Sequence, residues 1–182
     1  RAPGTYEVLM QKSQMIDVIR PTEVSGLGII PSRVELSNVE NELFEFENRE
    51  HLLRNAIRSL PERYDSIIID CPPGLGILTT NALVASDRVL VPLQCEFYAL
   101  EGLSQILRVI KKVKSELNSE LSLDGILLTM YDPRNKLSFQ VEEDVREVMG
   151  AIVYKTIIPR NIKISESPSH GKPVLLYDHK CI

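Results

Sequence analysis

The chain has 182 residues, of which 43% are hydrophobic and 25% charged, with a formal net charge of −4. This ordinary soluble composition predicts a single domain over residues 1–182, and no apolar run approaches the ~18 residues of a membrane span. Three widely spaced cysteines without a C-x-x-C pair argue against a disulfide framework or a structural zinc site, and favour a reducing cytoplasm.

Short apolar strands alternate with amphipathic helices along the chain. This alternation predicts an α/β fold with a doubly wound, mostly parallel sheet and helices on both faces. A helix through Met149 is expected to begin at a Ser138 cap and to end at Gly150. Strands are expected over 26–31, 66–70, 88–92, 125–130, 152–158 and 174–177, and helices over 6–19, 36–60, 75–85, 103–117 and 138–149.

The stretch 64–76, YDSIIIDCPPGLG, places a carboxylate at the end of a predicted buried strand. Asp70 follows three isoleucines, and the next residues interrupt regular structure with two prolines and Gly74. Ligands of doubly wound proteins bind at the carboxyl ends of parallel strands, so this acid predicts a phosphate or metal site. The residues alone leave a second interpretation open, in which Asp70 only caps the following helix.

Basic residues gather late in the chain. Between Lys155 and Lys172 four basic residues stand against Glu166 alone. A polyanion is expected to meet this segment, although a short basic run is also typical of a solvated surface.

Four blocks of sequence, taken together and in this order, resemble the signature segments of the ParA/Soj family of chromosome- and plasmid-partitioning ATPases. The resemblance covers nearly the whole chain. The blocks are IIIDCPPGLG (67–76), VLVPLQCEFYALEGLSQ (89–105), GILLTMYDPR (125–134) and TIIPRNIKISESPSHGKPVLLYD (156–178).

The resemblance implies a deviant Walker-type P-loop ATPase that binds ATP and Mg²⁺. Asp70 matches the Walker B acid that holds the metal through a water molecule. Pro72 and Gly74 match the switch segment, 71–74, that approaches the γ-phosphate, where the prolines fix φ and the glycine permits close backbone approach. The adenine-binding positions would be Thr129, Met130, Pro159 and Arg160.

The resemblance also implies partners. An ATP-sandwich homodimer would form with residues 96–104 facing the second subunit, and a ParB-type centromere-binding protein would stimulate hydrolysis. Arg134 and Lys163 match positions that bind DNA without sequence preference, and Lys172 extends this set. The protein would then be cytoplasmic and associated with the nucleoid, without stable membrane association.

One expected motif is missing from the chain. No G-x-x-x-x-G-K-[ST] occurs, and the only Gly-Lys pair, Gly171-Lys172, is followed by Pro173. We therefore expect a partial domain that lacks the central P-loop strand and the C-terminal helix, and that does not hydrolyse ATP alone. Neighbouring strands would lose a partner, which predicts poor solubility or a distorted sheet.

Two alternatives remain at this stage. One is a membrane-associated division-site ATPase similar to MinD, which would need an amphipathic C-terminal helix. The other is a non-catalytic scaffold that binds partners without a P-loop.

Overall fold

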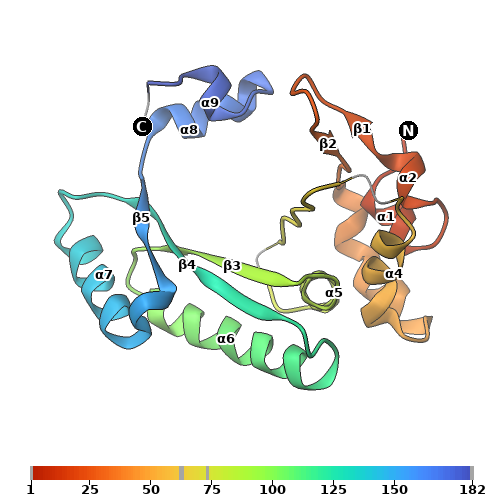
Figure 1. The fold of residues 1–182 in the computed structure, drawn as a ribbon, viewed down its shortest axis with the longest axis horizontal. Helices are drawn as coiled ribbons and strands as arrows, with labels where there is room; N and C mark the ends of the chain where they lie inside the picture. The colour runs from red at the N-terminus through yellow and green to blue at the C-terminus, as the bar shows by residue number, and fades with distance from the viewer. Residues whose placement is uncertain (1, 62–63, 73, 181–182) are drawn as a thin grey trace. The chain divides into compact units, whose positions relative to one another are not determined.

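The computed structural model describes residues 2–61, 64–72 and 74–180, and its contacts divide the chain into two compact units (Figure 1). Unit 1 comprises residues 1–87 and 109–122, and unit 2 comprises residues 88–108 and 123–182. In the described part of the chain, no helix is both long enough and apolar enough to cross a membrane.

Unit 1 is built mainly from short helices. The predicted helices near the start of the chain are present, and a two-stranded antiparallel ribbon follows them. Its elements are α1 (Thr5–Leu9), α2 (Met15–Val18), β1 (Arg20–Pro21), β2 (Gly28–Ile29), η1 (Val34–Asn38), α3 (Val39–Glu42), η2 (Leu43–Glu45), η3 (Arg49–His51), α4 (Leu52–Arg58) and α5 (Ile77–Ala85).

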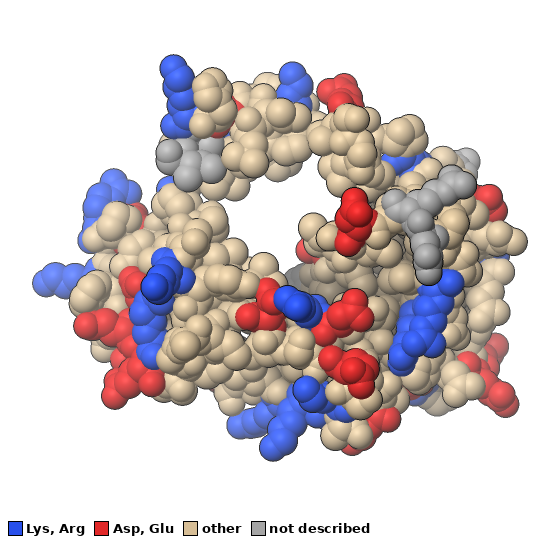
Figure 2. Space-filling view, in the orientation of Figure 1, with Lys and Arg blue, Asp and Glu red and all other residues tan. Residues whose placement is uncertain are grey.

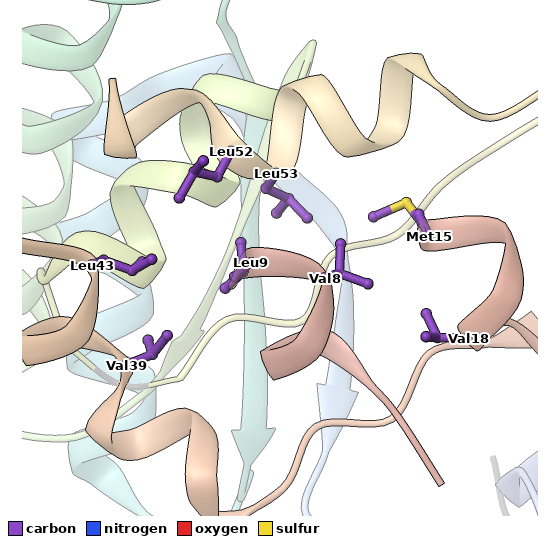
Figure 3. Packing of buried hydrophobic residues seen from close by; sticks show 8 residues of the cluster. All are labelled: Val8, Leu9, Met15, Val18, Val39, Leu43, Leu52 and Leu53. Carbon is purple, nitrogen blue, oxygen red and sulfur yellow. The ribbon is translucent and has the colours of Figure 1, made fainter. Parts of the chain in front are cut away.

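The core of unit 1 lies between these helices. Figure 3 shows its side chains, which α1, α2, α3, η2 and α4 contribute. Burying one such side chain contributes about 1.5–3 kcal/mol, so this cluster holds helices that are too short to be stable alone. The cluster consists of Val8, Leu9, Met15, Val18, Val39, Leu43, Leu52 and Leu53.

The helix predicted over 36–60 is wrong as a continuous element. It divides into α- and 3₁₀-helical pieces, and Asn48 between η2 and η3 has a φ of 52°. This left-handed conformation cannot continue a right-handed helix, and asparagine is among the few residues that adopt it readily. The chain changes direction there, and both Leu43 and Leu52 reach the same core.

The buried strand predicted over 66–70 is also wrong. These residues have no strand assignment, and the side chains of Ile67 and Ile68 are 48% and 92% exposed. A strand needs a neighbour for its main-chain groups, and among the described residues of unit 1 only β1 and β2 form a ladder, with each other. Ile69 alone packs against the core of unit 1.

Unit 2 contains a three-stranded sheet. Its strands are β3 (Arg88–Gln94), β4 (Ser122–Tyr131) and β5 (Val153–Pro159), in the order β3-β4-β5. β4 and β5 are parallel, with Ile126 opposite Val153 and Tyr131 opposite Pro159. The mostly parallel α/β class predicted from the sequence is confirmed.

Helices accompany the sheet of unit 2. The buried residues Val141 and Val145 of α7 belong to its core together with Ile126 and Leu128 of β4. The first half of α6 belongs to this unit and its second half to unit 1. The helices are α6 (Ala99–Glu116), α7 (Lys136–Met149), η4 (Gly150–Ile152), α8 (Ile162–Glu166), η5 (Ser167–His170) and α9 (Val174–Tyr177).

Three details of unit 2 differ from the sequence-based expectations. α7 begins at Lys136 because the side chain of Asn135, not that of Ser138, accepts the capping hydrogen bond, from Leu137 N at 3.0 Å. The residues after Arg160 are helical, since Asn161 caps α8 in the same way. Residues 174–177 form a helical turn instead of a strand, stabilised by hydrogen bonds to the carbonyl of Pro173.

Candidate functional site

The predicted metal ligand of unit 1, Asp70, is exposed on the irregular segment before α5. Of the proposed switch residues, Pro72 and Gly74 are described, whereas residue 73 lies outside the described residues. Gly74 has a φ of 144°, and no atom lies within 4 Å of the position that a Cβ would occupy. Its carbonyl accepts a hydrogen bond of 2.7 Å from Thr79 Oγ1, which ties the segment to α5. A side chain at this φ would strain the backbone, so glycine is required for conformation and leaves open space beside it.

The start of α5 is held by a residue that the sequence did not single out. Glu40 Oε1 accepts a hydrogen bond of 3.2 Å from Ile77 N, and the Glu40 carboxylate fills the space where a Cβ on Gly76 would lie. A carboxylate at a helix N-terminus satisfies an unpaired N–H group and interacts favourably with the helix dipole. Only the acidic character of residues 35–50 hinted at this role, because the contact joins residues distant in sequence.

Asn81 fixes the position of α5 from within unit 1. Its side chain is 1% exposed; Oδ1 accepts from Leu53 N at 3.1 Å and Nδ2 donates to the carbonyls of Arg49 and Ile77 at 2.8 and 3.1 Å. Three hydrogen bonds to the backbone of unit 1 therefore hold this side chain in place. This buried polar residue connects η3 and α4 to the helix that follows the Asp70 segment.

The described side chains fit a magnesium ion in only one mode of binding. Within the described residues, no group of three or more His, Cys, Asp or Glu side chains is arranged to hold a metal. Mg²⁺ typically keeps several waters and uses one or two carboxylates together with substrate phosphates. The single exposed carboxylate of Asp70 fits that mode of binding, and does not fit an all-protein metal cage.

In unit 2 the structure brings the predicted adenine-binding residues together at the carboxyl ends of two parallel strands. Thr129 and Met130 lie near the end of β4, and Arg160 N donates a hydrogen bond of 2.9 Å to the carbonyl of Tyr131. Met130 has a φ of 52°, which is uncommon for a residue of its size. The role of these residues in binding stays a prediction.

The residue that follows the end of β3 lies beside Arg160. Glu96, just after β3, lies 3.8 Å from Arg160 between Oε1 and a guanidinium nitrogen, and both side chains are more than half exposed. Such an exposed pair adds little stability, but it places one carboxylate and one guanidinium at the edge where three strands end.

A second network fixes the end of β4. The Tyr131 hydroxyl donates to the Glu142 carboxylate of α7, and this hydrogen bond is the main cause of a raised pKa at Tyr131. Glu142 Oε1 also accepts from Arg146 Nε at 2.9 Å. The network orients the loop that follows β4, and no sequence motif indicated it.

Both principal DNA-binding candidates lie in unit 2, and each contacts a carboxylate. Arg134 donates from Nε and a terminal nitrogen to the two oxygens of Asp132, at 2.9 and 2.8 Å. These hydrogen bonds lower the pKa of Asp132 to about 2. Lys163 Nζ lies 2.9 Å from Glu166 Oε2, and the same oxygen accepts from the Tyr177 hydroxyl at 3.2 Å. The third candidate, Lys172, is exposed and takes part in no ion pair with another described residue.

A family model and two relatives match most of the chain. Residues 2–123 match the model of a family described as an AAA domain. The chain is 50% identical over 173 residues to the sporulation initiation inhibitor protein Soj of Bacillus subtilis, which covers 95% of this chain and 68% of that protein. It is 51% identical over 183 residues to the chromosome partitioning protein ParA of Caulobacter vibrioides, covering 100% of this chain and 68% of that protein.

A solved structure extends the comparison to nucleotide-bound proteins. The cobyrinic acid a,c-diamide synthase of Mycobacterium smegmatis with bound ATP analogue and magnesium matches with a TM-score of 0.81 and 33% sequence identity. The match covers 93% of this chain and 74% of that one.

Proposed function

Because this chain belongs to the ParA/Soj family of partitioning ATPases, we propose that it serves DNA partitioning, binding ATP and Mg²⁺ and holding DNA without sequence preference. The observation that carries this proposal is the sequence identity with Soj of Bacillus subtilis and the chromosome partitioning protein ParA of Caulobacter vibrioides. About half of the positions are identical over 95–100% of the chain. Likeness of that extent favours partitioning over the division-site alternative.

In this proposal Asp70 holds the magnesium ion through a bound water. A bound Mg²⁺ would neutralise charge on the phosphates of ATP during hydrolysis. The chain's part is to present a carboxylate that is exposed to solvent. Pro72 contributes a fixed φ without an N–H donor, and the open space beside Gly74 lets backbone approach a phosphate closely.

The adenine is proposed to bind at the ends of β4 and β5. Thr129 and Met130 would supply backbone groups and apolar contact, with Pro159 and Arg160 beside them. The hydrogen bond between Arg160 N and the Tyr131 carbonyl supports this role, because it keeps the two strand ends adjacent before any ligand arrives.

Hydrolysis needs phosphate-binding groups that the chain does not contain. The 182 residues have no G-x-x-x-x-G-K-[ST] motif, so we expect no ATP turnover by the chain alone. A chimera that places a family member's P-loop segment ahead of residue 1 should hydrolyse ATP in a Mg²⁺-dependent manner. In that chimera Asp70→Ala should lower turnover about 100-fold or more, since a metal ligand supports several kcal/mol of charge stabilisation.

The nearby exposed Asp65 provides the matched control. Asp65→Ala removes the same charge five positions earlier and should leave turnover within about twofold of the parent chimera, as is usual for substitutions of exposed side chains. Equal turnover in the Asp70→Ala and parent chimeras would show that Asp70 is not the metal ligand.

DNA is proposed to bind to the basic residues of unit 2 through its phosphates. Arg134→Ala and Lys163→Ala should each weaken binding to unrelated duplexes by a similar factor, and should reduce the salt dependence by up to about one phosphate contact. A loss confined to one DNA sequence would instead indicate contacts with base edges.

The assembly steps complete the proposal. A second copy of the chain would pair with the first around ATP, a ParB-type protein would stimulate hydrolysis, and DNA binding would keep the protein on the nucleoid. Light scattering of the chimera with and without ATP tests the dimer. Measuring ATP hydrolysis by the chimera with a ParB-type protein and DNA tests the stimulation. Neither the ParB-type protein alone nor DNA alone should raise the rate of hydrolysis.

A further inference from the structure

The two main DNA-binding candidates share a feature that their sequence motifs do not reveal: each has its own carboxylate partner within three residues. Arg134 is paired with Asp132, and Lys163 with Glu166. We propose that Asp132 and Glu166 act as intramolecular competitors of DNA phosphates, so that they set the affinity for DNA and keep binding reversible. This inference rests on the proposed DNA-binding function.

The Arg134 pair is the more complete of the two. Two parallel hydrogen bonds join the guanidinium to the carboxylate, and Asp132 Oδ1 also accepts from Arg134 N at 3.0 Å. A guanidinium recognises a phosphate with the same two-pronged geometry that it uses for a carboxylate. A DNA phosphate must therefore displace Asp132 from the donors that it would use.

The Lys163 pair is reinforced by a neighbour. Glu166 Oε2 receives both the lysine ammonium and the Tyr177 hydroxyl, and the ammonium lies 5.7 Å from the centre of the Tyr177 ring. Tyr177 in turn stacks on His170, with ring centroids 4.8 Å apart. Since α8, η5 and α9 all contribute, the carboxylate is held beside the ammonium by more than the flexible side chains of the pair.

Both pairs can be reached by a large ligand. The Arg134 side chain is 87% exposed and that of Lys163 is 44% exposed. Over the part of unit 2 around α7, on the left of the view, Figure 2 shows Lys and Arg side chains interspersed with Asp and Glu. A surface of this kind attracts DNA weakly overall, so local competition for individual cations has a measurable effect.

The expected magnitude follows from the strength of exposed ion pairs. Such pairs alter an equilibrium by up to about fivefold, and the carboxylate also repels the approaching phosphate. Asp132→Asn or Glu166→Gln should therefore tighten DNA binding about three- to fivefold each, and about tenfold or more together. Both replacements keep an oxygen that accepts the hydrogen bond from Arg134 N or from Tyr177.

Salt dependence gives a second readout. When Arg134 leaves Asp132 for a phosphate, the freed carboxylate takes up a cation, which offsets the counterion released from DNA. Asp132→Asn removes this offset, so the slope of log K against log salt should steepen by up to about one.

The test is fluorescence anisotropy of a short labelled duplex of arbitrary sequence, with the chain present at several salt concentrations. Glu50→Gln is the matched control, because Glu50 pairs with Arg49 at 3.3 Å and the change in net charge is the same. We expect Asp132→Asn and Glu166→Gln to tighten binding while Glu50→Gln does not, and Asp132→Asn to tighten binding less once Arg134 is alanine. Urea unfolding of each variant checks that the fold is retained.

Two results would overturn the inference. One is tightening no greater than that of Glu50→Gln, and the other is equal tightening with and without Arg134. If Arg134→Ala and Lys163→Ala weaken binding in either case, the proposed DNA-binding function stands and the competition alone is wrong. If no variant, including Asp132→Asn with Glu166→Gln, binds DNA in a manner that depends on Arg134 or Lys163, both proposals fail.

Discussion

Two apolar segments of this chain end in polar loops, one before Asp70 in unit 1 and the other along β4 in unit 2. β4 lies between β3 and β5, and its Ile126 and Leu128 are fully buried. Residues 66–70 have no regular secondary structure, and among the described residues they make no backbone–backbone hydrogen bond. Similar sequences thus have different structures because only β4 has neighbours that pair with it.

This difference has a consequence for the site residues. The cluster at the ends of β4 and β5 is held by main-chain hydrogen bonds and by the Tyr131–Glu142 contact, so its geometry exists without ligand. Asp70 is fixed mainly from its flanks, where Ile69 packs on the core of unit 1 and Thr79 binds the carbonyl of Gly74. The strand ends are organised in advance, whereas the Asp70 segment depends on its surroundings.

The largest expected effect is a difference in the free energy of unfolding between substitutions in β4 and in residues 66–70. Leu128→Ala should reduce the free energy of unfolding by about 2–5 kcal/mol, because it removes a fully buried side chain and leaves a cavity in the sheet's core. Ile68→Ala should change it by less than about 0.5 kcal/mol, because that side chain is 92% exposed. Urea unfolding followed by circular dichroism measures both.

A comparable loss of unfolding free energy in Leu128→Ala and Ile68→Ala would contradict the difference between β4 and residues 66–70. It would mean that Ile68 is buried in solution and that residues 66–70 form a strand there.

The elements predicted correctly from the sequence are those whose apolar pattern fits a strand or helix and which have a neighbouring element to pack or pair with. The strands near 88–92, 125–130 and 152–158 and the helix ending at Gly150 were predicted. The prediction failed over 66–70, because three isoleucines indicate strand propensity without saying whether a partner exists. The contacts of Glu40 with α5 and of Asn81 with η3 join distant segments, so no local pattern could reveal them.

A smaller effect is expected from the polar anchor of α5. Asn81→Ala should lower the free energy of unfolding by about 1–3 kcal/mol, since it leaves the Leu53 N–H and the Arg49 carbonyl buried without this partner. Asn55→Ala is the control, because Asn55 is exposed on α4 and should change stability by less than about 0.5 kcal/mol. Equal values for the two variants in urea unfolding would show that Asn81 does not anchor α5.

The smallest expected effect concerns the loop that follows β4. The pKa of Asp132 is lowered from 3.8 to about 2, first by the side-chain hydrogen bonds from Arg134. A depressed carboxyl pKa contributes stability above pH 3.8, and this contribution is lost as the pH falls toward 2. In Arg134→Ala the pKa of Asp132 should return toward 3.8, as measured by carboxyl NMR titration. A pKa that stays near 2 would show that the ion pair is not its cause.

Amide hydrogen exchange, resolved by residue with NMR, tests most directly whether the strand ends of unit 2 are organised in advance while the Asp70 segment is not. We expect the hydrogen-bonded amides of β4 to exchange at least about a hundredfold more slowly than those of Ile67, Ile68 and Ile69, which lack ladder partners among the described residues. Equal protection of the two segments would contradict this expectation.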